Sequence, residues 1–244
     1  MFQNYIFDLY GTLIDINTNE WNIGLWKKMA EFYGFYGAEY TPKELKEAYF
    51  DQCRIQEEKL QKKSCVDYAE IKVEKVFKKL FSMKGVDMDM KTCKVACKFF
   101  RIISTKYIKL YDGVEELLDL LNSKGKKVYL LSNAQQVFTE YEMILLGIHD
   151  KFDGLVFSSN EKCRKPSTTF FDIVLDRYNL KKEESIMIGN DPISDIKGAY
   201  DSGLKSLYIH TNISPGNLDE DTLLSDYTIL DGDVKKIKDL IIKK

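Results

Sequence analysis

The stretch "YIFDLYGTLID", residues 5–15, begins as a short apolar run and ends in a turn, with one carboxylate, Asp8, at the junction. A short apolar run bounded by turn residues is consistent with a buried strand. Tyr10, Gly11 and Thr12 follow within four residues of the acid. The stretch therefore predicts a buried strand that carries an aspartate at its carboxyl end, with a phenol beside it.

The composition bounds the classes of protein that this chain can belong to. Its 244 residues allow one large or two modest domains, and 44% hydrophobic with 30% charged residues is typical of an ordinary soluble globular protein. The 36 basic and 38 acidic residues nearly cancel, so no basic field favours nucleic acid. We find no apolar stretch long enough to span a bilayer and no signal peptide at the start, and we expect a cytoplasmic protein.

The cysteines and histidines argue against most soft-metal and histidine-based sites. Five cysteines are scattered along the chain, and Cys93 and Cys97 lie one helical turn apart. A zinc site or a disulfide is possible for this pair, but buried free thiols in a reducing compartment are the favoured interpretation. Only His149 and His210 are available for metal sites or catalytic triads.

Six apolar runs have the length of strands, and most of those after the first are followed by a turn and a segment with helical spacing. Such alternation predicts a Rossmann-like α/β fold, in which a parallel sheet has helices on both faces. Ligands of such sheets bind beyond the carboxyl ends of the strands, which is where Asp8 falls. The predicted strands are Tyr5–Phe7, Val128–Leu131, Leu155–Phe157, Ile186–Ile188, Ser206–Ile209 and Tyr227–Leu230, and the predicted helical segments are 113–125, 135–147, 168–180 and 194–203.

The segment from about Asn17 to Lys109 has helical patterns and no convincing strand. Its "TPKE" at 41–44 is a capping box with proline at the first helical position, so a helix should begin there. Its aromatic residues could line a substrate pocket, although core packing within a small helical bundle is favoured for most of them; they include Trp26, Tyr33 and Tyr40. Two apolar stripes have helical spacing: Trp21, Leu25, Met29, Phe32 and Tyr36, and then Val66, Ala69, Val73, Val76, Phe77 and Leu80.

Polar residues stand at the carboxyl ends of four predicted strands. Each is unremarkable alone, but their order along one sheet edge is hard to obtain by accident; they are Asp8, then Ser132 and Asn133, then Lys165, then Asp191 and Asp195. A carboxylate can attack phosphorus or carbon to form a covalent intermediate. A phosphoryl group needs hydroxyl, amide and lysine donors around its oxygens. Further carboxylates near such a group indicate Mg²⁺, because without a cation they would repel phosphate.

These residues resemble, in order, the four motifs of the haloacid dehalogenase-like (HAD) hydrolase superfamily. The resemblance covers essentially the whole chain, and it implies a core domain of residues 1–16 and 110–244 with an all-helical cap domain, residues 17–109, inserted after the first strand. The matching positions are Asp8 with Gly11 and Thr12, Ser132–Asn133, Lys165–Pro166, and Asp191 with Asp195.

The resemblance also implies a role for each of these residues. Asp8 would be the nucleophile and a ligand of Mg²⁺, and the backbone carbonyl of Tyr10 would be a second ligand. Lys165 would neutralise charge around Asp8. Asp191 and Asp195 would complete the metal site, and the phosphoryl group would be positioned by Thr12, Ser132 and Asn133.

Tyr10 departs from the phosphatase pattern of that superfamily, which has a second aspartate at this position to protonate the leaving group. A phenol, with a reference pKa near 10, is a poor base near neutral pH. "DLYGTL" is similar instead to the 2-haloacid dehalogenases, which release halide without a proton and without metal. Those enzymes use an arginine early in the cap, and this chain has none before Arg54. Asp191 favours the phosphatases.

The sequence thus predicts a Mg²⁺-dependent hydrolase that acts on a small phosphorylated metabolite through an aspartyl-phosphate intermediate. Two alternatives stay open: a 2-haloacid dehalogenase that uses Asp8 without metal, and a non-catalytic protein that binds a phosphate ligand or regulates. The expected partner is a small phosphorylated substrate, and neither nucleic acid nor a membrane is expected. Specificity is expected from the cap, which closes over such sites.

Overall fold

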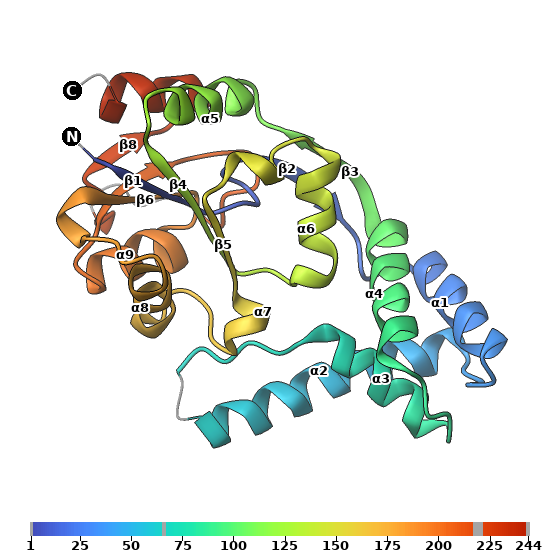
Figure 1. Cartoon of the computed structure of the whole chain (residues 1–244). Coiled ribbons are helices and arrows are strands. Elements are labelled where there is room, and N and C mark those ends of the chain that lie inside the picture. The colour runs from blue at the N-terminus through green and yellow to red at the C-terminus, as the bar shows by residue number, and fades with distance from the viewer. Residues whose placement is uncertain (1, 65–66, 217–221, 243–244) are drawn as a thin grey trace.

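Six parallel strands form one sheet in the order β5-β4-β1-β6-β7-β8 in the computed structural model of the chain, which describes residues 2–64, 67–216 and 222–242 (Figure 1). All six strands predicted from the sequence are present, and their ends lie within a residue of the predicted ones. The strands are β1 Asn4–Phe7, β4 Lys127–Ser132, β5 Gly154–Phe157, β6 Ser185–Gly189, β7 Lys205–Ile209 and β8 Tyr227–Ile229. The prediction of a parallel α/β sheet is confirmed.

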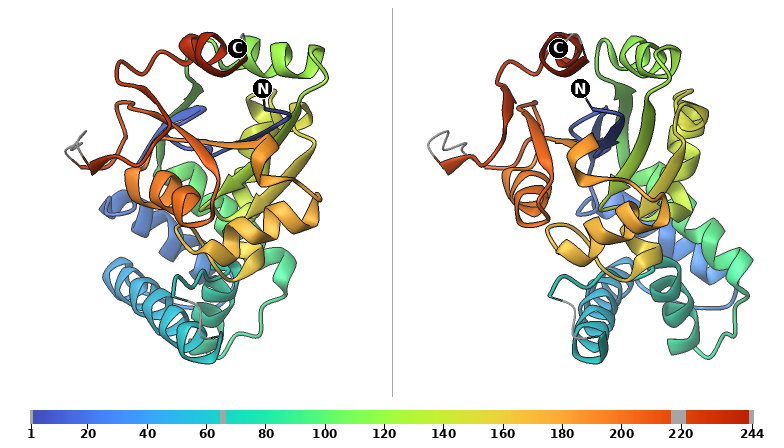
Figure 2. Two further views of the ribbon diagram at one scale, coloured as in Figure 1. Left: turned by 90° about the vertical axis from the view of Figure 1, so that its left-hand side faces the viewer. Right: turned by 60° about the vertical axis from the view of Figure 1, so that its left-hand side comes forward.

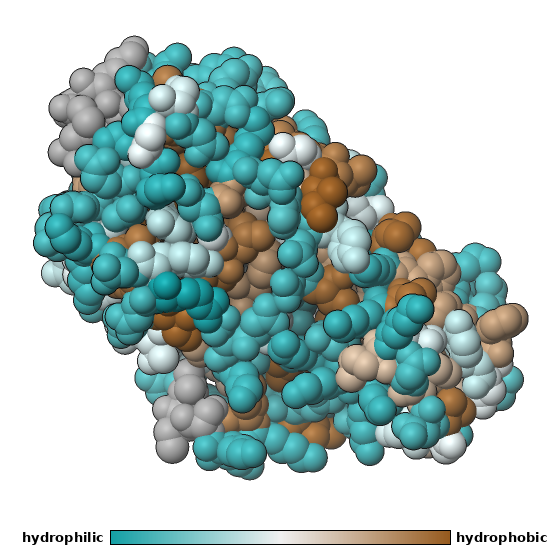
Figure 3. Space-filling model, viewed as in Figure 1, coloured by the Kyte–Doolittle hydropathy of each residue, from teal (hydrophilic) through white to brown (hydrophobic). Residues whose placement is uncertain are grey.

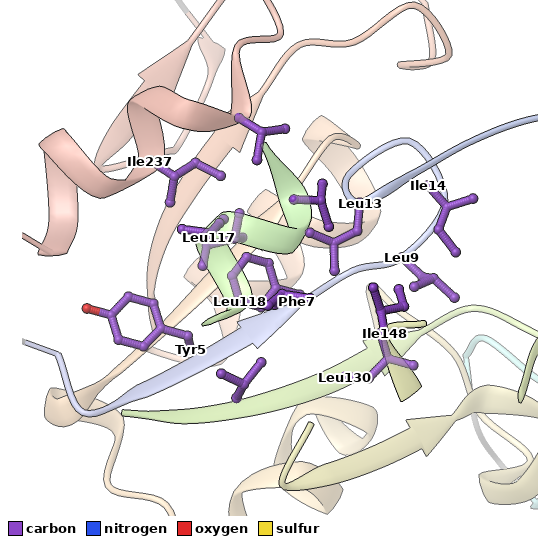
Figure 4. Close-up of a cluster of buried hydrophobic side chains, with 14 of the residues drawn as sticks. Tyr5, Phe7, Leu9, Leu13, Ile14, Leu117, Leu118, Leu130, Ile148 and Ile237 are labelled. Atoms are coloured by element: carbon purple, nitrogen blue, oxygen red, sulfur yellow. The ribbon is translucent and has the colours of Figure 1, made fainter. Parts of the chain in front are cut away.

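Side chains alternate across this sheet and pack under helices on both faces. From β1, Tyr5 and Phe7 point to one face, where α5 packs, whereas Ile6 points to the other, where α8 and α9 pack. Figure 4 shows the first of these clusters, with Leu117 and Leu118 of α5 near Phe7. The predicted helices are confirmed as α5 Val114–Ser123, α6 Gln136–Leu145, α8 Thr168–Arg177 and, from 194 on, a wide helical turn Pro192–Lys197 that continues into α9 Gly198–Asp201.

Short helical segments connect or end these elements. They are α7 Ser158–Glu161, the turns His149–Lys151 and Lys182–Glu184, and the C-terminal turns Val234–Lys236 and Lys238–Ile242. Val234 and Ile237 are buried against the same face as α5, so the C-terminal turns help to close this side of the core.

Four helices between β2 and β3 form a separate group beneath the sheet in both views of Figure 2, and we call this group the helical insert. Its interior is rich in aromatic rings, and Trp26 and Tyr33 are fully buried there, as core packing predicts. The capping box is confirmed, because Thr41 N–H donates to Glu44 Oε2 at 2.8 Å and Glu44 N–H to Thr41 Oγ1 at 3.2 Å. The helices are α1 Ile23–Phe35, α2 Pro42–Ser64, α3 Val73–Met83 and α4 Met90–Ser104.

Two details of the predicted apolar stripes are wrong. Trp21 is 69% exposed and stacks on Phe50 at the surface instead of joining the core of the helical insert. Ala69 lies before the first residue of α3, in an extended segment that pairs with Cys163 of the α/β core. Val66 and Cys65 lie outside the described residues, and the four other cysteines, Cys93 and Cys97 among them, are free thiols.

The antiparallel strands β2, Ile14–Thr18, and β3, Thr105–Leu110, join the helical insert to the α/β core. The expectation that residues 17–109 contain no strand was therefore wrong. Both strands are half-exposed, and "TKYIKL" alternates charged or polar residues with few apolar ones, so its apolar signal is weak. The ribbon extends directly from the turn after Asp8, so the helical insert is attached beside the carboxyl end of β1.

The surface offers scattered apolar side chains. On the face shown in Figure 3, hydrophilic residues cover most of the area, and hydrophobic ones are exposed in smaller areas between them. Such exposure is ordinary for a globular surface. Within the described part of the chain, none of the helices combines the length and apolar character needed to cross a membrane.

Candidate active site

The predicted site residues meet at one edge of the sheet. Phe7 of the central strand β1 is paired with Leu130 of β4 and with Ile188 of β6, so the carboxyl ends of these three strands are adjacent. A cavity of about 270 Å³ opens beyond them. It is lined by Asp8, Tyr10, Ser132, Asn133, Lys165, Asn190, Asp191, Ser194, Asp195, Ile213 and Pro215. Thr12, the remaining predicted residue, is fully buried and bonds to Asp8.

The turn after Asp8 depends on a glycine. Gly11 has a φ of +88°, and a Cβ atom there would lie 2.2 Å from the side-chain nitrogen of Asn190. Only glycine accepts both the left-handed backbone and this close approach. The turn lets Leu13 and Ile14 donate their N–H groups to the carbonyl of Leu9 and brings Thr12 Oγ1 to 3.3 Å from Asp8 Oδ2. Asp8 is thus held at the floor of the cavity.

Lys165 lies between the carboxylates of Asp8 and Asp195, two of the three aspartates that line the cavity. Its Nζ lies 2.7 Å from Asp8 Oδ1 and 2.7 Å from Asp195 Oδ1, and the ammonium is almost fully buried. Burial acts to lower the pKa of Lys165, but the carboxylates of Asp195 and Asp8 outweigh burial, and the pKa is raised. Lys165 is therefore charged near neutral pH and lies in the cavity lining between Asp8 and Asp195, where the neutralising role expected for it needs a cation.

Asn133 holds the backbone of Lys165 in place. Its Oδ1 accepts from Lys165 N–H at 2.8 Å and its Nδ2 donates to Lys165 C=O at 3.0 Å. Ser132 Oγ lies 3.5 Å from Asp8 Oδ1, a long contact that leaves this hydroxyl available to another acceptor. The second and third predicted motifs thus form one unit around Asp8.

Asp191 and Asp195 both reach the cavity, in different ways. Asp191 Oδ1 accepts from the N–H groups of Ile193 and Ser194 and so begins the helical turn that follows. Asp195 Oδ2 accepts from Asp191 N–H at 2.9 Å, and its carboxylate packs against Gly189, where a Cβ would lie 2.3 Å from Oδ2. Burial raises the pKa of Asp195 to about 7, with Lys165 acting to lower it and Asp8 to raise it.

The donor atoms of the cavity suit a hard cation such as Mg²⁺. The carboxylates of Asp8, Asp191 and Asp195 supply oxygen ligands of the kind that Mg²⁺ prefers. Asp195 Oδ1 is buried and, although Lys165 Nζ is close, it has no partner in hydrogen-bond geometry among the described residues. Over the described ranges, no three His, Cys, Asp or Glu side chains converge as a ready-made metal centre. The residue types therefore fit a cation, while Lys165 Nζ occupies the space between the carboxylates of Asp8 and Asp195.

The phenol of Tyr10 is bonded away from Asp8, to helix α6 of the core. Its hydroxyl contacts Glu142 Oε2 and lies 2.9 Å from Thr139 Oγ1. Arg101, from α4 of the helical insert, forms a two-point ion pair with Glu142 and lies 5.2 Å from the Tyr10 ring centroid. Burial and the Glu142 carboxylate raise the pKa of Tyr10 well above its ordinary value. The phenol therefore keeps its proton, and the Arg101–Glu142 pair beside it links the helical insert to the core.

Sequence reasoning missed several residues of this site. Asn190 had a detectable signal, since it ends β6 beside Asp191, and its Oδ1 lies 3.3 Å from Thr12 Oγ1. Ile213 and Pro215, in the loop after β7, had none, because apolar loop residues carry no chemistry of their own. Arg101 and Glu142 lie 41 residues apart and meet only in the folded chain.

Known proteins share this fold and parts of this sequence. The family model for haloacid dehalogenase-like hydrolases matches residues 5–209. The glyceraldehyde 3-phosphate phosphatase of Methanothermobacter thermautotrophicus is 31% identical over 126 residues, covering 51% of this chain and 55% of that protein. The phosphoserine phosphatase of Thermus thermophilus is 24% identical over 122 residues, covering 50% and 48%. This chain spans about half the length of these curated relatives.

Solved structures are similar over nearly the full length of the chain. The 2-haloacid dehalogenase of Pseudomonas syringae pv. tomato DC3000 has a TM-score of 0.67 at 18% identity and 100% and 99% coverage of the two chains. The HAD phosphatase of Thermococcus onnurineus has a TM-score of 0.61 at 15% identity and 97% and 96% coverage. At these identities the likeness concerns the fold. Because the family model spans most of the sequence, this chain belongs to the haloacid dehalogenase-like hydrolases.

Proposed function

We propose that the protein is a Mg²⁺-dependent phosphoester hydrolase that acts on a small phosphorylated metabolite through an aspartyl-phosphate intermediate. The observation that carries the proposal is the position of Asp8 at the floor of the cavity, with Lys165 and Asp195 directly beside it. The names of the relatives at 31% and 24% identity, a glyceraldehyde 3-phosphate phosphatase and a phosphoserine phosphatase, support the same class of reaction.

The proposed reaction has two displacements at phosphorus. In the first, a carboxylate oxygen of Asp8 forms a bond to phosphorus while the bond to the leaving alcohol breaks, and the departing oxygen takes a proton from solvent or from the substrate. In the second, water attacks phosphorus, the bond to Asp8 breaks, and inorganic phosphate leaves with the free carboxylate restored. Lys165, Ser132 and Asn133 offer the donors that the phosphoryl oxygens need.

Mg²⁺ would be held by Asp8, the backbone carbonyl of Tyr10, Asp191 and Asp195. When bound, it would offset the negative charge of the phosphoryl group and of the three carboxylates. The oxygen donors of the three aspartates support this assignment, and so does the burial of Asp195 Oδ1, which pairs with Lys165 but has no partner in hydrogen-bond geometry among the described residues. Lys165 alone leaves the lining with a net negative charge, because it is one cation against three aspartates.

Tyr10 gives this hydrolase no general acid at the position where related phosphatases have one. Its proton is donated toward Glu142, with Thr139 Oγ1 at hydrogen-bond distance from the phenol oxygen, and its raised pKa keeps the proton on Tyr10. We expect Tyr10→Phe to change kcat for 4-nitrophenyl phosphate by less than about fivefold, because losing a true general acid costs about 10²–10⁴-fold. The unfolding free energy should fall by about 1–2 kcal/mol, since Glu142 loses a buried donor.

Tyr107→Phe is the matched control for that variant. Tyr107 also donates to a carboxylate, Asp15 Oδ1 at 3.1 Å, but from the ribbon that joins the two parts of the molecule. Steady-state kinetics and chemical denaturation of both variants make the comparison. A loss of 100-fold or more in Tyr10→Phe alone would show that the phenol takes part in the reaction.

A single-turnover assay on 4-nitrophenyl phosphate tests the proposed function. Nitrophenol release that needs Mg²⁺ and disappears in Asp8→Asn supports the phosphatase. Chloride release from 2-chloropropionate without metal would indicate a dehalogenase instead. The arginines of the helical insert give the dehalogenase hypothesis little support. Arg54 pairs with Asp51 and Glu58 at the surface, and Arg101 pairs with Glu142. Phosphate binding with neither reaction would indicate a binding protein.

A further inference from the structure

Residues 68–72 of the helical insert, which we call the extended segment, contact the two core loops that carry the second and third motifs. Figure 1 shows this segment in teal, directly beneath α7 and leading into α3. Its backbone forms a short antiparallel bridge with residues 162–164, in which Arg164 N–H donates to Tyr68 C=O at 3.0 Å. The insert is therefore hydrogen-bonded to the residue that directly precedes Lys165.

The side-chain amide of Gln135 makes a second connection to the same segment. Gln135 directly precedes α6, but its side chain makes no capping hydrogen bond to that helix. Instead its Oε1 accepts from Val73 N–H at 2.9 Å, and its Nε2 donates to Ile71 C=O at 2.9 Å and to Glu70 Oε1 at 3.0 Å. Val73 is the first residue of α3, and its N–H has no acceptor within that helix, so Gln135 caps a helix of the insert instead of its own.

Glu70 extends this network into the second motif. Its Oε2 accepts from the Ser158 hydroxyl at 3.1 Å, and Ser158 Oγ accepts from Ala134 N–H at 2.9 Å. Ala134 lies in the chain between Asn133 and Gln135. The loop that carries Asn133 is thus bonded to the extended segment twice, directly through Gln135 and indirectly through Ser158.

The two loops that the extended segment contacts also hold each other. Asn133 binds both backbone groups of Lys165, so the second and third motifs move together. The segment is bonded to this pair one residue before Lys165 and two residues after Asn133. A displacement of the segment is therefore transmitted to the donors that the phosphoryl oxygens need, and an error of about 1 Å in such groups can cost about 10²-fold in rate.

We propose that Gln135 is a positioning residue of the hydrolase, which fixes Asn133 and Lys165 by holding the extended segment of the insert against them. The proposal rests on the proposed function and adds to it a residue outside the cavity, since Gln135 is not among the described residues that line it. Gln135 acts on the reaction only through the two motifs that it supports.

Gln135→Met tests this role, because methionine keeps the length of the side chain and removes all three hydrogen bonds. We expect kcat for 4-nitrophenyl phosphate to fall about tenfold or more, while KM changes less than about threefold, because the displaced donors act on the transition state. Asn4→Leu is the matched control. Asn4 is a buried amide that donates to Ser185 Oγ at 3.1 Å at the amino end of β1, the end away from Asp8. It should leave kcat unchanged.

Hydrogen–deuterium exchange of peptides that cover residues 162–167 measures the same role without turnover. The amides of Arg164 and Lys165 should exchange about tenfold or more faster in Gln135→Met, and at the wild-type rate in Asn4→Leu. Wild-type kcat or wild-type exchange in a folded Gln135→Met overturns the proposal, and so does a loss that appears in KM alone.

Glu70→Ala is the second variant if Gln135→Met does not fold. It removes the acceptor that Gln135 Nε2 and the Ser158 hydroxyl share, so it should change kcat and amide exchange in the same direction. Wild-type values of both in Glu70→Ala overturn the proposal in the same way.

The proposed function can fail separately. If the wild-type protein does not hydrolyse 4-nitrophenyl phosphate, the phosphatase assignment falls, and amide exchange alone decides whether Gln135 holds the two motifs in place. Faster exchange at Lys165 in Gln135→Met then supports that role, and unchanged exchange refutes it. If the wild type is active and Gln135→Met is equally active, the hydrolase stands and the positioning role falls.

Discussion

Asp8→Asn should abolish phosphate ester hydrolysis, with kcat lower by about 10⁴-fold or more. The amide keeps the shape of the side chain but removes the nucleophilic oxygen. The other carboxylates of the cavity cannot replace it, because Asp191 Oδ1 is bonded to the N–H groups of Ile193 and Ser194 and Asp195 faces Lys165. Phosphate release and covalent labelling by radioactive phosphoryl donor should disappear together.

The stability of this variant separates loss of chemistry from loss of fold. Lys165 keeps Asp195 as its partner when Asp8 becomes neutral, so the unfolding free energy should change by no more than about 1 kcal/mol. Asp226→Asn is the control: Asp226 bonds to Ser206 N–H and Lys205 at the opposite edge of the sheet. It should keep the activity. If Asp8→Asn retains even a tenth of wild-type kcat while folded, Asp8 is not the nucleophile.

The sequence was a good guide to the parts of this molecule that local patterns encode. The six strands of the parallel sheet were predictable because each is a short apolar run between turn residues, which is typical of buried parallel strands. The four polar clusters could be predicted to converge because the carboxyl ends of parallel strands share one sheet edge. Ser132, Asn133, Lys165 and the two acids near position 190 all line the cavity.

The features that could not be predicted from the sequence depend on contacts between residues that are distant in the chain. The role of the Tyr10 phenol follows from Glu142, which lies 132 positions away, and from Arg101 on a helix of the insert. The ribbon β2–β3 was missed because both strands are half-exposed and their apolar pattern is weak. Only the pairing between them identifies them as strands. Ile213 is held at the cavity because Thr211 and Ser214 of its loop are hydrogen-bonded to Gly11 and Asn190.

Lys165→Met should cost both activity and stability, and its effect on stability should depend on pH. Removing one partner of a buried ion pair typically costs about 3–5 kcal/mol, because the other charge stays buried. Here two carboxylates, Asp8 and Asp195, lose their shared cation. We expect the unfolding free energy at pH 8, in EDTA, to fall by about 3 kcal/mol, measured by chemical denaturation.

The direction of the pH dependence follows from Asp195. Its pKa is raised to about 7 by burial even with Lys165 present. A carboxyl group whose pKa is higher in the folded than in the unfolded state favours folding at low pH, and this contribution is lost as the pH rises through the folded-state pKa. Without Lys165, burial and Asp8 raise the pKa of Asp195 further, opposed only by the hydrogen bond from Asp191 N–H, so the variant should be closer to the wild type at pH 5 than at pH 8.

A double variant and a matched lysine complete the test. Lys165→Met combined with Asp195→Asn leaves one buried carboxylate instead of two, so it should recover about 1–2 kcal/mol at pH 8 without recovering activity. Lys126→Met removes another buried lysine, whose Nζ bonds to the carbonyl of Phe2 and to Gln3 and, among the residues that the structure describes, to no carboxylate. Its cost should be the same at both pH values. Equal losses at pH 5 and pH 8 in Lys165→Met, or no recovery in the double variant, would mean that Lys165 is not the cation that holds the two aspartates together.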